Sequence, residues 1–134
     1  MLTSLSGSYL IIDDDESLRN LLSVIVESAG AETHLAATPK EALEQLATHK
    51  EKIKGALLDL NLEQAKGEDL YDQLIEISPD LDVFPMSGCG REEIEDRLGS
   101  KRAAGCIPKP FLSADLIATL ANAAKQKTLS SKRV

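Results

Sequence analysis

Five side chains of types that can handle a phosphoryl group stand at the ends of apolar runs in this sequence. They are Asp13, Asp14, Asp59, Ser87 and Lys109. Carboxylates bind Mg²⁺ through oxygen, a lysine ammonium pairs with carboxylate or phosphoryl oxygens, and a serine hydroxyl can donate a hydrogen bond to the same oxygens. A carboxylate beside a cation is also equipped to attack phosphorus and form an acyl phosphate. If the fold brings these side chains together, they predict phosphoryl chemistry with Mg²⁺.

Each of these residues also has an ordinary structural explanation. Asp15 suits the N-cap of a helix, and Asp13 and Asp14 could serve the same purpose. Ser87 is followed by glycine and could belong to a turn, while Lys109 lies between two prolines and could be a solvated loop residue. The functional interpretation therefore depends on where the strands end.

Strand-like and helical patterns alternate along the chain. Strands are expected at Tyr9–Ile12, Thr33–Ala36, Ile53–Leu58, Val83–Met86 and Gly105–Pro108. Helices are indicated by an apolar stripe of Leu18, Leu21, Leu22, Ile25 and Ala29, by a capping box at Thr38–Glu41, by the segment after Gly67, by Arg91–Arg102 and by a helix that Ser113 can cap. Repeated βα units predict an α/β domain with a parallel sheet and helices on both faces. Ligands of such sheets bind at the carboxyl ends of the strands, which is where the candidate residues fall.

Length and charge narrow the class of protein. A chain of 134 residues with 43% hydrophobic residues fits one globular domain, expected at residues 8–126 with flexible termini at 1–7 and 127–134. A net charge of −7 without a basic run argues against nucleic-acid binding. No apolar stretch of about 18 residues and no signal-peptide pattern is present, so we expect no membrane span and a cytoplasmic protein.

The cysteines and histidines give weaker indications. Cys89 and Cys106 do not make a disulfide framework and fit a reducing compartment, although a regulatory disulfide between them is left open. His34 and His49 are expected at the surface, and no metal-ligand spacing links them.

Four motifs together resemble the receiver domain of two-component response regulators. They are LIIDDDESLR (10–19), LLDLNL (57–62), MSG (86–88) and PKPF (108–111). The resemblance covers roughly residues 8–125 and implies a flavodoxin-like, doubly wound sheet of five strands in the order 2-1-3-4-5 with five helices. It also implies a signalling domain rather than an enzyme, with no chemistry beyond its own phosphorylation and dephosphorylation.

The resemblance assigns a role to each acid by position. Asp59 resembles the phosphoacceptor and also a ligand of Mg²⁺. Asp14 resembles the direct Mg²⁺ ligand, and Asp13 resembles the acid that acts through water. Asn61 would offer its backbone carbonyl to the metal. The implied cofactor is therefore Mg²⁺.

The resemblance also implies a switch and its partners. Ser87 resembles the hydroxyl that follows the phosphoryl group, and Lys109 resembles the family's lysine, whose bond to Pro110 would be cis. A histidine kinase or a phosphotransfer protein would supply the phosphoryl group. A downstream protein would read the surface formed by the fourth helix, the fifth strand and the fifth helix.

Several residues depart from the family pattern. Cys106 stands where receivers usually carry Tyr or Phe, Glu63 stands where Pro is common, Pro85 lies within the fourth strand, and Cys89 flanks the site. An alternative function is therefore a receiver-fold interaction module that does not switch on phosphorylation. A phosphohydrolase is a weaker alternative, because it would want a second acid at Asn61.

The chain could be a free-standing receiver or part of a longer protein. No DNA-binding, enzymatic or kinase segment is recognised after residue 127. Both possibilities, including a receiver from a hybrid histidine kinase, are left open.

Overall fold

One parallel sheet forms the centre of the molecule, and the computed structural model describes it within residues 4–132. The strands are β1 (Ser8–Ile12), β2 (Glu32–Ala36), β3 (Ile53–Asp59), β4 (Asp82–Ser87) and β5 (Ile107–Pro108). Every neighbouring pair is parallel and the order is β2-β1-β3-β4-β5. The predicted fold class and strand order are confirmed.

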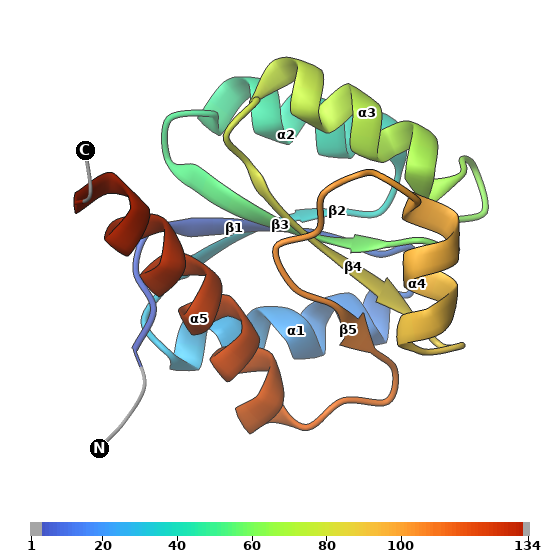
Figure 1. The fold of residues 1–134 in the computed structure, drawn as a ribbon. Helices are drawn as coiled ribbons and strands as arrows, with labels where there is room; N and C mark the ends of the chain where they lie inside the picture. The colour runs from blue at the N-terminus through green and yellow to red at the C-terminus, as the bar shows by residue number, and fades with distance from the viewer. Residues whose placement is uncertain (1–3, 133–134) are drawn as a thin grey trace.

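Helices cover both faces of this sheet. They are α1 (Glu16–Ser28), α2 (Pro39–His49), α3 (Gly67–Ile77), α4 (Arg91–Leu98) and α5 (Ser113–Lys132). Helices α2 and α3 lie on one face and α1 and α5 on the other, while α4 lies beside the end of β4 (Figure 1). The carboxyl ends of the central strands and the start of α4 therefore share one edge of the molecule.

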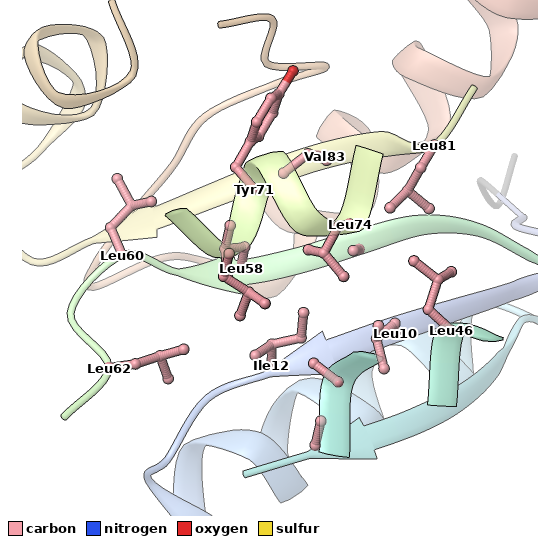
Figure 2. Close-up of a cluster of buried hydrophobic side chains, with 14 of the residues drawn as sticks. Leu10, Ile12, Leu46, Leu58, Leu60, Leu62, Tyr71, Leu74, Leu81 and Val83 are labelled. Atoms are coloured by element: carbon pink, nitrogen blue, oxygen red, sulfur yellow. The ribbon is translucent and has the colours of Figure 1, made fainter. Parts of the chain in front are cut away.

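Successive residues of the central strands supply two separate cores. Leu10, Ile12 and Leu58 point to the α2–α3 side, where Leu46 and Leu74 pack against them (Figure 2). The residues between them on the strands point to the α1–α5 side and belong to the second core. Strands buried on both faces read as nearly continuous apolar runs, which explains why they were recognised in the sequence.

Polar side chains fix where the first two helices begin. Asp15 caps α1, because its carboxylate accepts a hydrogen bond from the Leu18 N–H at 3.2 Å. Thr38 caps α2 in the same way, with its hydroxyl 3.1 Å from the Glu41 nitrogen. After α1 the chain turns at Gly30, whose φ is +109° and whose missing Cβ would lie 2.8 Å from a backbone oxygen. These boundaries follow directly from residue type.

Two helix predictions need correction. Leu21 was counted in the apolar stripe of α1, but it is 51% exposed, because it lies about 100° around the helix from the buried Leu22. Helix α4 ends at Leu98 rather than at Arg102, since Gly99 takes a φ of +57° that favours glycine. Helix α5 continues to Lys132, and the flexible terminus expected at residues 127–134 stays a prediction.

Strand β5 is shorter than the predicted Gly105–Pro108, and Pro85 gives a reason. The Val83 carbonyl accepts a hydrogen bond from the Ala104 N–H, and the Ser87 carbonyl accepts one from the Lys109 N–H, each at 2.8 Å. Both carbonyls therefore face β5. Pro85 shares their direction because residues two apart along a strand point the same way, so its missing N–H falls on the β5 side. The ladder with β3 is therefore intact, and β5 pairs only from Met86 onward.

Among the residues that the structure describes, no helix is long and apolar enough to cross a membrane.

Candidate functional site

The carboxyl ends of β1 and β3 bring three acids together. Ile12 pairs with Leu58, so the residues that follow β1 lie beside Asp59, the last residue of β3. Asp13, Asp14 and Asp59 each offer a carboxylate oxygen within 4.8 Å of the others. Asp13 and Asp59 are buried, while Asp14 is exposed. The site therefore opens to solvent on the side of Asp14.

Lys109 faces the two buried acids of this group. Its Nζ lies 3.2 Å from Asp13 Oδ2 and 3.5 Å from Asp59 Oδ1. Lys109 follows β5 directly, where its N–H donates to the Ser87 carbonyl at 2.8 Å, and its bond to Pro110 is cis, as the resemblance implied. One ammonium thus partly neutralises two carboxylates that would otherwise repel each other.

Burial dominates the protonation of Asp13. It raises the pKa of this carboxyl above its ordinary value of 3.8, and the nearby charge of Asp59 raises it further. A hydrogen bond from the Asp15 N–H and the charge of Lys109 oppose that shift. Because the pKa of Asp13 is raised, its ionised form is unfavourable in the folded protein when no cation is bound between Asp13, Asp14 and Asp59.

The loop after β3 is tied to the same acids. The Asn61 N–H donates to Asp59 Oδ1 at 2.9 Å, and the Glu63 N–H donates to Asp14 Oδ2 at 3.0 Å. Glu63 thus fixes the loop through its backbone, although the proline common at its position in the family is missing. Both acids keep other lone pairs for a cation, since a carboxylate offers about four acceptor sites.

These donors fit Mg²⁺. The ion prefers oxygen ligands, usually one or two carboxylates with waters and a phosphoryl oxygen. Asp13, Asp14 and Asp59 supply oxygens at one point, and no His or Cys belongs to the group. Like charges gathered so closely are also the arrangement that a dication would relieve.

Ser87 lies at the end of β4, but its hydroxyl is hydrogen-bonded to other groups than Asp13, Asp14 and Asp59. Its side chain is buried, and its hydroxyl donates to Glu93 Oε2 at 2.8 Å while accepting from the Cys89 N–H at 3.1 Å. Glu93 is on α4, so the Ser87 hydroxyl is directed toward that helix. The structure therefore brings four of the five candidate side chains together and engages the fifth elsewhere.

Sequence reasoning missed Glu93 and Arg97. Arg97 contacts both Glu93 and the loop after Asp59. An i,i+4 acid–base pair on a polar helix is ordinary surface patterning, so no sequence signal sets this pair apart.

Both cysteines are free thiols, and neither is activated. The carboxylate of Glu93 raises the pKa of the exposed Cys89 thiol through a hydrogen bond and its charge. Burial raises the pKa of Cys106, which packs against the α2–α3 core. Because thiolates are the reactive form, both sites are unfavourable for thiol chemistry at neutral pH.

His34 and His49, which were expected at the surface, are both half-buried and stack on each other. Their ring centroids lie 4.2 Å apart, at an interplanar angle of 25°. A metal bound by both would have to lie near the plane of each ring, which stacking prevents. The pair is a packing contact between β2 and the end of α2.

Comparison with known proteins decides the family. The family model for the response regulator receiver domain matches residues 9–121. The chain belongs to this family. A receiver domain from Clostridium thermocellum, a solved structure, superposes with a TM-score of 0.83 at 23% identity, covering 92% of this chain and 98% of that one. That likeness shows the fold, and the family shows a signalling domain rather than a typical enzyme.

Several relatives of this receiver are longer proteins. The chain is 32% identical to the transcriptional regulatory protein CpxR homolog of Haemophilus influenzae over 115 residues, which cover 85% of this chain and 48% of that protein. It is 28% identical to the sensor kinase CckA of Brucella abortus over 120 residues, covering 88% of this chain and 13% of the kinase. NtrX from Brucella abortus superposes with a TM-score of 0.78 at 26% identity over 94% of the chain and 29% of NtrX. The receiver thus spans about half or less of these relatives.

Proposed function

We propose that this receiver is a phosphoacceptor switch in which Asp59 takes a phosphoryl group from a histidine kinase or a phosphotransfer protein. The observation that carries the proposal is the position of Asp59, buried at the end of β3 with Lys109 Nζ 3.5 Å from its carboxylate. Asp13 and Asp14 lie beside it within 4.8 Å. A nucleophile, a cation and a metal-binding acid group thus share one rim.

In the proposed reaction, a carboxylate oxygen of Asp59 forms a bond to phosphorus while the bond from phosphorus to the donor's imidazole nitrogen breaks. The imidazole keeps the bonding electrons and takes up a proton. Asp13, Asp14, Asp59 and the backbone carbonyl of Asn61 would hold Mg²⁺, which when bound neutralises phosphoryl charge. Lys109 adds a second positive charge at the same oxygens.

Ser87 would report the modification. Its hydroxyl would leave Glu93 and donate to a phosphoryl oxygen, and the surface of α4, β5 and α5 would change with it. A downstream protein partner would bind that surface more or less tightly. Each change is a shift between two conformations, driven by contacts that only one of them can make.

Incubation with acetyl phosphate and Mg²⁺, followed by intact-mass measurement, tests the proposal. The expected result is a mass gain of one phosphoryl group, with acetate as the leaving group, that requires Mg²⁺ and is lost in Asp59→Asn. Asp96→Asn is the matched control, since Asp96 is an exposed aspartate of α4. No gain in the wild type, or a gain that survives in Asp59→Asn, would reject the assigned role.

Cys106 favours a second candidate, a receiver-fold binding module that does not switch. The thiol is half-buried against the α2–α3 core and lacks the ring that receivers commonly carry there. This candidate predicts that the phosphorylated and unphosphorylated proteins bind a partner with equal affinity. An affinity change on phosphorylation would reject it.

A further inference from the structure

In this structure the Ser87 hydroxyl donates its hydrogen bond to the carboxylate of Glu93. The donor–acceptor distance is 2.8 Å and the acceptor is a carboxylate, which makes the hydrogen bond stronger than one between neutral groups. The carboxylate form is favoured, because hydrogen bonds from Cys89 and then from Ser87 lower the pKa of Glu93. A serine hydroxyl has one hydrogen to donate. While Ser87 binds Glu93, it cannot donate to a group on Asp59.

Arg97 connects the same carboxylate to the loop that follows Asp59. One nitrogen, Nη1, lies 3.5 Å from Glu93 Oε1 and 2.7 Å from Asn61 Oδ1. The other, Nη2, lies 2.6 Å from the Leu60 carbonyl oxygen and 2.6 Å from Glu68 Oε1. A planar guanidinium holds several acceptors in fixed directions, so this side chain joins α4 to the β3–α3 loop and to α3.

These contacts form a continuous polar path beside the acid rim, which consists of Asp13, Asp14 and Asp59. It runs from the Ser87 hydroxyl through Glu93 and Arg97 to the backbone of Leu60, the residue directly after Asp59. The path is partly shielded from water, since the side chains of Arg97 and Glu93 are 22% and 27% exposed. A change in the partner of Ser87 therefore acts on α4 through a charged acceptor rather than through apolar packing.

We propose that Glu93 and Arg97 are positioning residues of the switch. Glu93 holds the Ser87 hydroxyl on α4 and competes with the phosphoryl group for it, and Arg97 holds Glu93 and the loop at residues 60–61 in the conformation that permits this contact. When the hydroxyl moves to the phosphoryl group, the start of α4 loses its hydrogen bond to β4. The inference rests on the proposed function of Asp59.

Affinity for beryllium fluoride with Mg²⁺ tests the competition, because this probe mimics a phosphoryl group on a carboxylate. Removing the competing acceptor in Glu93→Ala should tighten binding by about 10-fold, the value of one charged hydrogen bond. Glu93→Gln, which keeps a neutral acceptor, should fall between Ala and the wild type. Glu92→Ala removes an exposed acid of the same helix and should leave the affinity unchanged.

A double-mutant cycle separates competition for the hydroxyl from a merely structural effect. In a Ser87→Ala background no hydroxyl remains to be released, so Glu93→Ala should no longer tighten binding. Tightening of the same size with and without Ser87 would overturn the proposal, as would unchanged affinity in Glu93→Ala.

Amide hydrogen exchange tests the part assigned to Arg97. In the wild type, beryllium fluoride should speed exchange in residues 91–98; in Glu93→Ala that segment should already exchange fast without the probe. Arg97→Ala should do the same and also speed exchange at residues 60–63, whereas Arg91→Ala, at an exposed arginine of the same helix, should match the wild type. Wild-type exchange in Arg97→Ala would overturn this role.

Every variant except the Asp59 substitutions keeps the proposed phosphoacceptor, so mass gain with acetyl phosphate distinguishes the two failures. If the α4 variants gain the phosphoryl group but show wild-type affinity and exchange, only the present inference fails. If no variant gains it, the proposed function fails and this inference fails with it.

Discussion

The acid rim and the α4–β5 side of the molecule lie at the same edge of the sheet but are built differently. The rim is carried by β1 and β3, which span Ser8–Ile12 and Ile53–Asp59 and are buried on both faces. The other side consists of β5, with two residues, and of α4, with eight, of which only Ile94 and Leu98 are buried. Burial on both faces makes local opening costly, whereas short elements with polar faces open at lower free energy.

This difference suits the two tasks proposed for them. Attack on phosphorus needs side chains held in fixed positions, because misplacement of the reacting groups is costly. A response needs an element with two conformations of similar free energy. In the proposed function the rim therefore supplies the three acids for the chemistry, and the side with weaker packing supplies Lys109 and the change of conformation.

Loss of Lys109, which follows β5 and reaches the two buried acids of the rim, gives the largest expected effect and tests what the α4–β5 side contributes to the chemistry. Lys109→Met should slow phosphorylation by acetyl phosphate by about 10²-fold, because one preorganised cation at the developing charge is lost. Intact-mass time courses measure the rate. Lys127→Met is the control, since Lys127 pairs with Asp82, away from the rim. Equal rates in the two variants would contradict the assignment.

Equal truncations in the two regions test the difference in packing. Leu58→Ala in β3 should lower the free energy of unfolding by about 4 kcal/mol, because the site is fully buried between strands and helices that cannot collapse. Leu98→Ala at the end of α4 should cost about 2 kcal/mol, since a short helix can move into the space. Urea unfolding measures both. A larger loss at Leu98 would reverse the comparison.

A neutral residue at position 13 tests whether the three acids of the rim lower the stability of the folded protein when no cation is bound. The pKa of Asp13 is raised in the folded protein, so its charge lowers stability as the pH rises above the ordinary value of 3.8. Asp13→Asn should therefore raise the free energy of unfolding at neutral pH by roughly 1 kcal/mol without Mg²⁺. Urea unfolding with and without Mg²⁺ should show that the gain shrinks when the ion is present. A less stable Asp13→Asn protein without Mg²⁺ would contradict this view.

The histidine pair, formed by His34 of β2 and His49 at the end of α2, predicts the smallest effect. Burial, then the charges of His49 and Lys52, lower the pKa of His34, while Glu32 and Gln45 oppose this. The unfolded chain therefore binds more protons below the ordinary value of 6.5, and stability falls as the pH drops through it.

We expect a loss on the order of 0.5 kcal/mol between about pH 7.5 and about pH 5.5 that is absent in His34→Phe, which keeps a ring but cannot titrate. Unfolding in urea at several pH values measures it, and the difference between the two proteins removes the contribution of other groups. An identical pH dependence in both would show that the stack does not resist protonation.

Most of the site's acids could be located from the sequence because local patterns fix where strands end. Apolar runs followed by Asp13 and Asp59 determine that both acids leave the sheet at one edge, and parallel pairing then places them side by side. Helix caps at Asp15 and Thr38 followed from residue type in the same way. The length of β5 did not, because the direction of Pro85 within β4 depends on its partner strands.

The sequence by itself determined the order of strands and helices along the chain and the residues at which most of them begin or end, because hydrophobic periodicity and capping act between residues close in the chain. Only the tertiary structure decided that the Ser87 hydroxyl binds Glu93 and that Arg97 binds the backbone of Leu60. The partners of a polar helix face depend on how that helix docks, and docking is set by packing between residues far apart in sequence.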